Sequence, residues 1–100
     1  MTIGVIAKIT IQEGKTEEAI AAFQPILAAV EDEESTIRYI LHTDAKDPNL
    51  LWFYEQYADQ AAMDVHGTSD TMKAVGMALR GIAAARPEIT VLGIVGGKNI

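Results

Sequence analysis

Cysteine is absent from the 100 residues of this chain. Its absence excludes disulfides, cysteine-ligated zinc, iron–sulfur clusters and thiol nucleophiles. It is compatible with a reducing compartment, so we expect a cytoplasmic protein. The chain has only two histidines, His42 and His66, and they lack the spacing of a metal-binding motif. A phosphate-binding glycine motif is also missing. We therefore expect neither a metal nor a bound cofactor.

Long apolar runs and positive charge are scarce as well. No segment approaches the roughly 20 apolar residues that a membrane-spanning helix needs, and no secretory signal is visible. Lys and Arg number 8 against 14 Asp and Glu, which gives a net charge of −6. An acidic domain without a basic stripe is a poor candidate for binding nucleic acid or an anionic membrane. Length and a hydrophobic content of 49% predict one folded domain over residues 1–100.

Aromatic residues concentrate in residues 37–66, which hold all three Tyr, the only Trp and both His. Residues 37–43 and 50–57 are rich in β-branched and aromatic side chains, which is typical of strands. The segment between them contains Asp47-Pro48-Asn49, whose residue types favour a turn. The stretch therefore predicts an antiparallel hairpin followed by a helix.

The second hairpin strand is apolar on both faces. Side chains alternate along a strand, so Leu51, Phe53, Glu55 and Tyr57 share one face, and Leu50, Trp52, Tyr54 and Gln56 share the other. A strand of this kind needs cover on both sides. The domain's own helices can cover one face. We expect a second subunit, bound sheet to sheet, to cover the other.

The remaining elements follow from periodicity and capping. Residues 2–11 predict a first strand, and Gly14 is free to adopt a positive φ in the turn after it. Residues 17–32 carry an apolar stripe at helical spacing, with Thr16 as the expected N-cap. We expect Pro25 to bend this helix without ending it, because the stripe continues in phase. The acidic residues 31–34 are expected to form a solvated, fraying helix end.

The second half of the chain predicts two helices and a strand. Asp59 is the expected N-cap of a short helix over residues 60–66, and Ser69 or Asp70 that of a longer one reaching about residue 85. Residues 88–95 predict the last strand. The resulting order, β-α-β-β-α-β, is the α+β ferredoxin-like arrangement, an antiparallel sheet with helices on one face.

Several local motifs, taken together, resemble the antibiotic biosynthesis monooxygenase family over nearly the whole chain. They are Glu13-Gly14-Lys15, residues 25–30, Arg38-Tyr39 with Leu41-His42, Asp47-Pro48-Asn49, Glu55-x-Tyr57-Ala58-Asp59 with Ala62 and His66, and Arg86-Pro87-Glu88-Ile89. The resemblance implies a dimeric α/β barrel. It also implies relatives that include cofactor-free quinol monooxygenases and isomerase-like proteins.

His66 and Glu55 are the candidate catalytic residues. His66 could act as a general base on a phenolic substrate, because imidazole titrates near neutral pH. A hydrogen-bonded structural histidine is the alternative. Glu55 lies among aromatic residues, where burial raises the pKa of a carboxyl group, and it could orient His66 or bind a substrate hydroxyl. An ion pair with Arg38 or Arg80 is the alternative for Glu55.

Tyr39, Tyr57 and Phe53 are the candidate substrate-pocket residues, since aromatic walls with O–H donors suit a flat molecule. The alternative for them is ordinary sheet core or dimer interface. The function expected from the resemblance is a monooxygenase that oxidises a quinol or a similar small aromatic compound with O2. A non-catalytic dimeric module that binds a small hydrophobic molecule and an isomerase of a small carbonyl compound remain alternatives.

Overall fold

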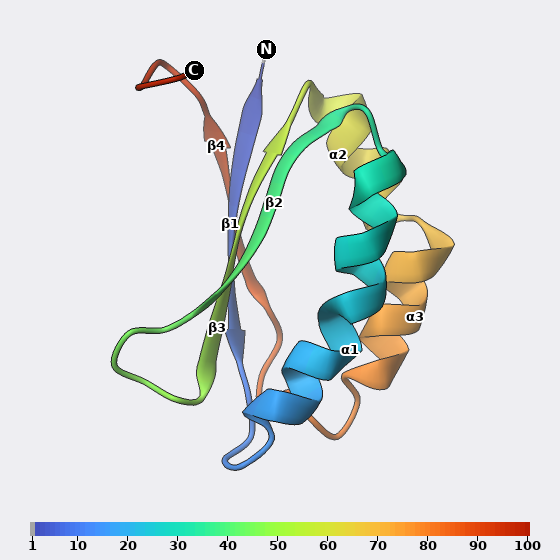
Figure 1. Ribbon diagram of the computed structural model, residues 1–100, viewed down its shortest axis with the longest axis vertical. Helices are drawn as coiled ribbons and strands as arrows, with labels where there is room; N and C mark the ends of the chain where they lie inside the picture. Colours follow the sequence, from blue (N-terminus) through green and yellow to red (C-terminus); the bar gives the residue numbers. More distant parts are fainter. Residues whose placement is uncertain (1) are drawn as a thin grey trace.

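The computed structural model describes residues 2–100. In chain order its elements are β1 (Ile3–Thr10), α1 (Thr16–Ala29), η1 (Val30–Asp32), β2 (Thr36–Thr43), β3 (Leu50–Tyr57), α2 (Gln60–Gly67), α3 (Asp70–Ala78) and β4 (Glu88–Gly93). The strands form one antiparallel sheet in the order β2-β3-β1-β4, and the helices lie on one of its faces (Figure 1). The predicted α+β ferredoxin-like arrangement is confirmed, and β2 and β4 remain as open edges of the sheet.

The core lies between the sheet and the helices α1 and α3. Its buried residues are Ala7, Ile9, Ile11, Ala19, Phe23, Ile26, Leu51, Phe53 and Val75. The strand residues among them occupy alternate positions, because successive side chains of a strand point to opposite faces. Those of α1 recur every three or four residues, because these positions share one face of a helix. Phe23 and Phe53 meet edge to face, with ring centroids 4.9 Å apart. This contact fixes α1 against the centre of β3.

The first helix is continuous through Pro25, as predicted. Its start differs from the prediction, because Lys15 occupies the N-cap position and makes no side-chain capping bond. The hydroxyl of Thr16 instead donates to the carbonyl oxygen of Pro48 at 2.6 Å, which ties the beginning of α1 to the hairpin loop. Gly14 has a φ of +80°, in agreement with its predicted role in the preceding turn.

The predicted caps of the later helices are confirmed. The carboxylate of Asp59 accepts from the amide of Ala62 at 2.8 Å, and the hydroxyl of Ser69 accepts from the amide of Met72. None of the helices among residues 2–100 is both long and apolar enough to cross a bilayer.

The predicted extension of the last helix to residue 85 is wrong, since α3 ends at Ala78. The carbonyl of Ile82 and the amide of Ala84 bond instead to the backbone of Gln12 and Thr10, at the end of β1. Gly81, with a φ of +79°, allows the chain to leave the helix for these bonds. Tertiary hydrogen bonds thus override the helical periodicity of this segment.

A β-bulge interrupts the pairing of β2 with β3. Thr36 lies opposite Tyr57 and Arg38 lies opposite Gln56, so Ile37 is the extra residue. Beyond the bulge, Tyr39 pairs with Glu55. Because one residue is inserted, Thr36 and Tyr39 both face the helices although they are three positions apart.

Candidate functional site

A pocket of about 470 Å³ lies between the sheet and the two short helices. Its lining comes from every strand and from α2 and α3: Val5, Tyr39, Glu55, Tyr57, Met63, Asp64, His66, Gly67, Thr68, Met72 and Ile89. The volume is in the range of about 300–1,000 Å³ that is usual for small-molecule sites. Four of the five candidate residues, His66, Glu55, Tyr39 and Tyr57, line this one pocket.

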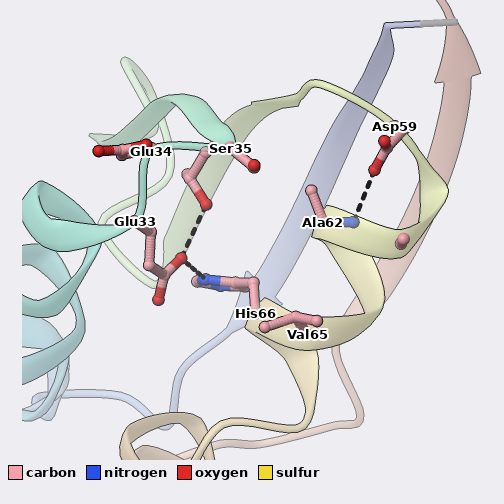
Figure 2. A pocket seen from close by; sticks show the side chains of 9 residues that line it. Glu33, Glu34, Ser35, Asp59, Ala62, Val65 and His66 are labelled. Atoms are coloured by element: carbon pink, nitrogen blue, oxygen red, sulfur yellow. Dashed lines mark hydrogen bonds and ion pairs between the residues drawn. The ribbon is translucent and has the colours of Figure 1, made fainter.

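His66 is in the last turn of α2 and is only 4% exposed. Its Nδ1 lies 2.9 Å from Oε1 of Glu33 (Figure 2). Its ring stacks obliquely near Tyr39 and Tyr57, at centroid distances of 4.8 and 5.4 Å. His66 is therefore buried, although it lies near the end of a helix. The register of the sheet and the length of α2 bury it between the two tyrosines.

The two nitrogens of this imidazole have different surroundings. Nδ1 faces Glu33, whereas no protein group within residues 2–100 bonds to Nε2. No fully buried side-chain nitrogen or oxygen in that range lacks a hydrogen-bond partner, so Nε2 keeps some accessible surface. His66 lines both the large pocket and a second, solvent-open pocket of about 410 Å³ beside Glu33 (Figure 2).

Glu55 and Tyr57 form a buried pair on β3. The hydroxyl of Tyr57 donates to Oε1 of Glu55 at 2.5 Å. Burial raises the pKa of Glu55, and the Tyr57 hydrogen bond and the nearby charge of protonated His66 offset only part of that effect. The predicted Glu55–His66 hydrogen bond is absent, and so is an ion pair from Glu55 to Arg38 or Arg80 among the described residues. Arg38 donates instead to the side chain of Gln56.

Tyr39 and Phe53 have different places in the structure. Tyr39 lines the pocket, and its ring lies 4.7 Å from that of Phe53. Phe53 is 2% exposed and belongs to the core. It packs against Tyr39 but does not line the pocket. Trp52 and Tyr54 lie on the opposite face of β3, as the alternation predicted, and Trp52 donates to Asp44 through Nε1.

Both pocket tyrosines are hydrogen-bond donors at neutral pH. Burial, followed by the negative charges of Glu55 and Glu33, raises the pKa of Tyr39 far above its usual value. Burial, the hydrogen bond to Glu55 and the charge of Glu55 likewise raise the pKa of Tyr57 far above its usual value. Neither phenol can therefore supply a base, which leaves His66 and Glu55 as the proton acceptors of the pocket.

Glu33 is the residue that sequence reasoning missed. It lies in the acidic segment 31–34, which the sequence predicts to be a fraying helix end. In the structure its carboxylate accepts from the hydroxyl of Thr36 at 2.7 Å and contacts His66. The sequence carries one usable signal, since Thr36 lies three residues after Glu33, a spacing that permits a side-chain hydrogen bond across a turn. The contact with His66 has no such signal, because the two residues are 33 positions apart.

Comparison with solved structures supports a common fold. A candidate antibiotic biosynthesis monooxygenase from Caulobacter crescentus is 30% identical, with a TM-score of 0.89 over 95% of this chain and 91% of that one. A protein from Shewanella oneidensis is 26% identical, with a TM-score of 0.84 over 91% and 88% of the two chains. A further candidate monooxygenase, from Nitrosomonas europaea, is 18% identical but has a TM-score of 0.89 over 96% and 100%.

The sequence profile of one family covers most of the chain. No protein of curated function matches the sequence significantly. The profile of the antibiotic biosynthesis monooxygenase family matches residues 2–76, which include β1 to β3 and the pocket residues Tyr39, Glu55, Tyr57 and His66. The chain therefore belongs to the antibiotic biosynthesis monooxygenase family.

Proposed function

We propose that this protein is a cofactor-independent monooxygenase that oxidises a quinol or a similar small phenolic compound with O2. The observation that carries the proposal is the single pocket in which a buried histidine, a buried carboxyl group and two tyrosine hydroxyls converge. Membership of the family and the candidate monooxygenases of the same fold support the reaction class. The flat aromatic rings of Tyr39 and Tyr57 suit an aromatic substrate.

In the proposed reaction His66 is the general base. Its Nε2 bonds to no group of residues 2–100 and can accept a proton from a substrate hydroxyl, as long as the imidazole is neutral. Glu55 holds the Tyr57 hydroxyl through one oxygen and leaves the other for a second substrate hydroxyl. The raised pKa of Tyr39 keeps its hydroxyl protonated, so it can donate to the oxyanion that deprotonation produces, whereas the proton of Tyr57 is already donated to Glu55.

The atoms and electrons balance with the substrate and O2 alone. Deprotonation makes the quinol a better reductant, and one electron passes to O2 to give a semiquinone and superoxide. These combine by forming a C–O bond, the O–O bond then breaks, and water leaves. The quinol loses four electrons and becomes a hydroxyquinone, while one oxygen atom is incorporated and the other is reduced to water. The protein supplies the base, the hydrogen bonds and a pocket that holds the reactants together.

Oxygen uptake tests this proposal. Purified, metal-free protein is given a panel of benzo- and naphthohydroquinones in air and under anaerobic conditions, with boiled protein as the control for autoxidation. We expect enzyme-dependent oxygen uptake and a hydroxyquinone product that acquires one atom from ¹⁸O2. Turnover of a carbonyl substrate without oxygen would contradict the oxygenase proposal and support an isomerase. Binding of aromatic compounds without any turnover would contradict the oxygenase proposal and support a non-catalytic binding module.

We further propose that the protein is a homodimer paired through the outer sheet faces, which would make it the dimeric α/β barrel that the resemblance implies. The face opposite the helices is apolar at its centre, where Ile6, Tyr54 and Ile40 are adjacent across β1, β3 and β2. Ile6 and Ile40 are 37% and 44% exposed in the single chain. Contiguous exposed apolar side chains on a sheet mark an interaction surface. A cytoplasmic location remains a prediction from composition.

The dimer is tested by placing a charge at the centre of this face. We expect the wild-type protein to have the mass of a dimer by light scattering at micromolar concentration. The interface of such a dimer should bury more than ~2,000 Å² in total. Ile40→Lys should give monomers, because the ammonium group would be buried without a partner. Met77→Lys, at an exposed position on α3, is the matched control and should remain dimeric. A wild-type monomer would contradict the proposal.

A further inference from the structure

Glu33 is held in place by its own backbone and by its neighbours. Its amide donates to the carbonyl of Val30, and its carbonyl accepts from the amide of Thr36, both at 3.0 Å. The carbonyl of Ser35, inside the same turn, accepts from the amide of Ala58 at the end of β3. This turn is therefore fixed to the start of α2, the helix that carries His66.

The carboxylate of Glu33 accepts two hydrogen bonds at the same oxygen. The hydroxyl of Thr36 donates to Oε1 at 2.7 Å, and Nδ1 of His66 lies 2.9 Å from that atom. The β-bulge at Ile37 turns Thr36 inward while keeping Tyr39 beside His66. Bulges often re-aim side chains next to active sites, and this one places Thr36 against Glu33 and Tyr39 against His66.

The acceptor determines where the imidazole carries its hydrogen. An ionised carboxylate can only accept, so Nδ1 of His66 must be the donor, and in the neutral ring Nε2 then has the free lone pair. When Nε2 takes a proton, the ring becomes a cation, and the negative charge of Glu33 stabilises it. The same relation between a carboxylate and an imidazole operates in hydrolytic triads.

We infer that Glu33 is the positioning residue of the His66 base: it holds the Nδ1–H tautomer, directs Nε2 to the substrate, and stabilises the imidazolium after proton transfer. This inference rests on the proposed function. It also reassigns a role, because the sequence pointed to Glu55 as the partner of His66, whereas Glu55 bonds to Tyr57. The two carboxyl groups thus have different partners: Glu33 bonds to the base His66, and Glu55 bonds to Tyr57 in the pocket wall.

The test combines a spectroscopic measurement with kinetics. Nitrogen-15 NMR of the histidine side chains, in the neutral form, should show the His66 hydrogen on Nδ1 in the wild-type protein. In Glu33→Leu both tautomers should be populated. With a hydroquinone probe, Glu33→Gln and Glu33→Leu should lower kcat by roughly 10- to 100-fold, comparable with losing the carboxylate behind a metal-bound histidine. Glu34→Gln, in the same acidic segment, is the control and should keep the wild-type kcat.

The outcomes separate this inference from the proposed function. A wild-type His66 with its hydrogen on Nε2 overturns the inference without any variant, so a Glu33→Leu protein that fails to fold does not weaken the test. An unchanged kcat in Glu33→Gln also overturns it and leaves the oxygenase intact. Absence of oxygen uptake by the wild-type protein overturns the oxygenase, and the tautomer measurement then decides whether Glu33 sets the state of His66.

Discussion

Replacing His66 with Gln should lower kcat for quinol oxidation by roughly 10²–10⁴-fold, the usual contribution of a general base. Glutamine has no group that accepts a proton near neutral pH. Its amide N–H can still donate toward Glu33, so the variant removes the base while retaining a hydrogen-bond donor. Oxygen uptake at saturating quinol measures the loss, and thermal unfolding checks that the variant remains folded.

His66→Ala should lose the same activity and stability as well. The side chain is buried, and its removal takes one of the two donors from Glu33 and leaves a cavity beside Tyr39 and Tyr57. Loss of a buried hydrogen-bond partner typically costs about 1–3 kcal/mol. The exposed His42 offers a matched control, and His42→Ala should retain full turnover. Wild-type turnover by His66→Gln would show that His66 is structural and that the base lies elsewhere.

Glu55→Gln should have opposite effects on activity and on stability. Burial raises the folded-state pKa of Glu55 above its usual 4.5. Between the unfolded and the folded pKa, the unfolded chain has already lost this proton while the native protein retains it. The contribution of Glu55 to the free energy of unfolding is therefore fully present below about pH 4.5, and it is lost as the pH rises through the folded-state pKa.

Glutamine stays neutral and can still accept from the Tyr57 hydroxyl, so the variant avoids the cost of a buried negative charge. The melting temperature of Glu55→Gln should exceed that of the wild-type protein at pH 7, and the difference should disappear below pH 4.5. Turnover should fall, but by less than in His66→Gln. A variant less stable than the wild type at pH 7 would show that a partner of the charged carboxylate outweighs its burial.

Asp59→Asn is a control for both experiments, since it changes an acidic residue near the site without touching the pocket chemistry. Asp59 accepts from the amide of Ala62 at the start of α2, and asparagine is about as good a cap as aspartate. Its stability and its turnover should therefore both stay close to wild type. A loss of turnover here would point to a disturbed α2 in place of a lost base or carboxylate.

The sequence by itself determined the features that depend on neighbouring residues. The alternation in residues 50–57 was enough to place Glu55 and Tyr57 on one face and Trp52 on the other, because side chains of a strand alternate. The cap Asp59 was identifiable, and the second cap was narrowed to Ser69 or Asp70, because a cap bonds to an amide two or three positions ahead. The element order that follows from these local signals was sufficient for the ferredoxin-like arrangement.

Only the tertiary structure decided the partners of the site. The bulge at Ile37 sets the register that brings Tyr39 to Glu55, and no local preference of the sequence reveals an inserted residue of this kind. Glu33 and His66 are 33 positions apart and meet because α2 folds back over the turn before β2. The burial of His66 and the early end of α3 have the same origin: packing and hydrogen bonds between distant segments outweigh the local signals at those positions.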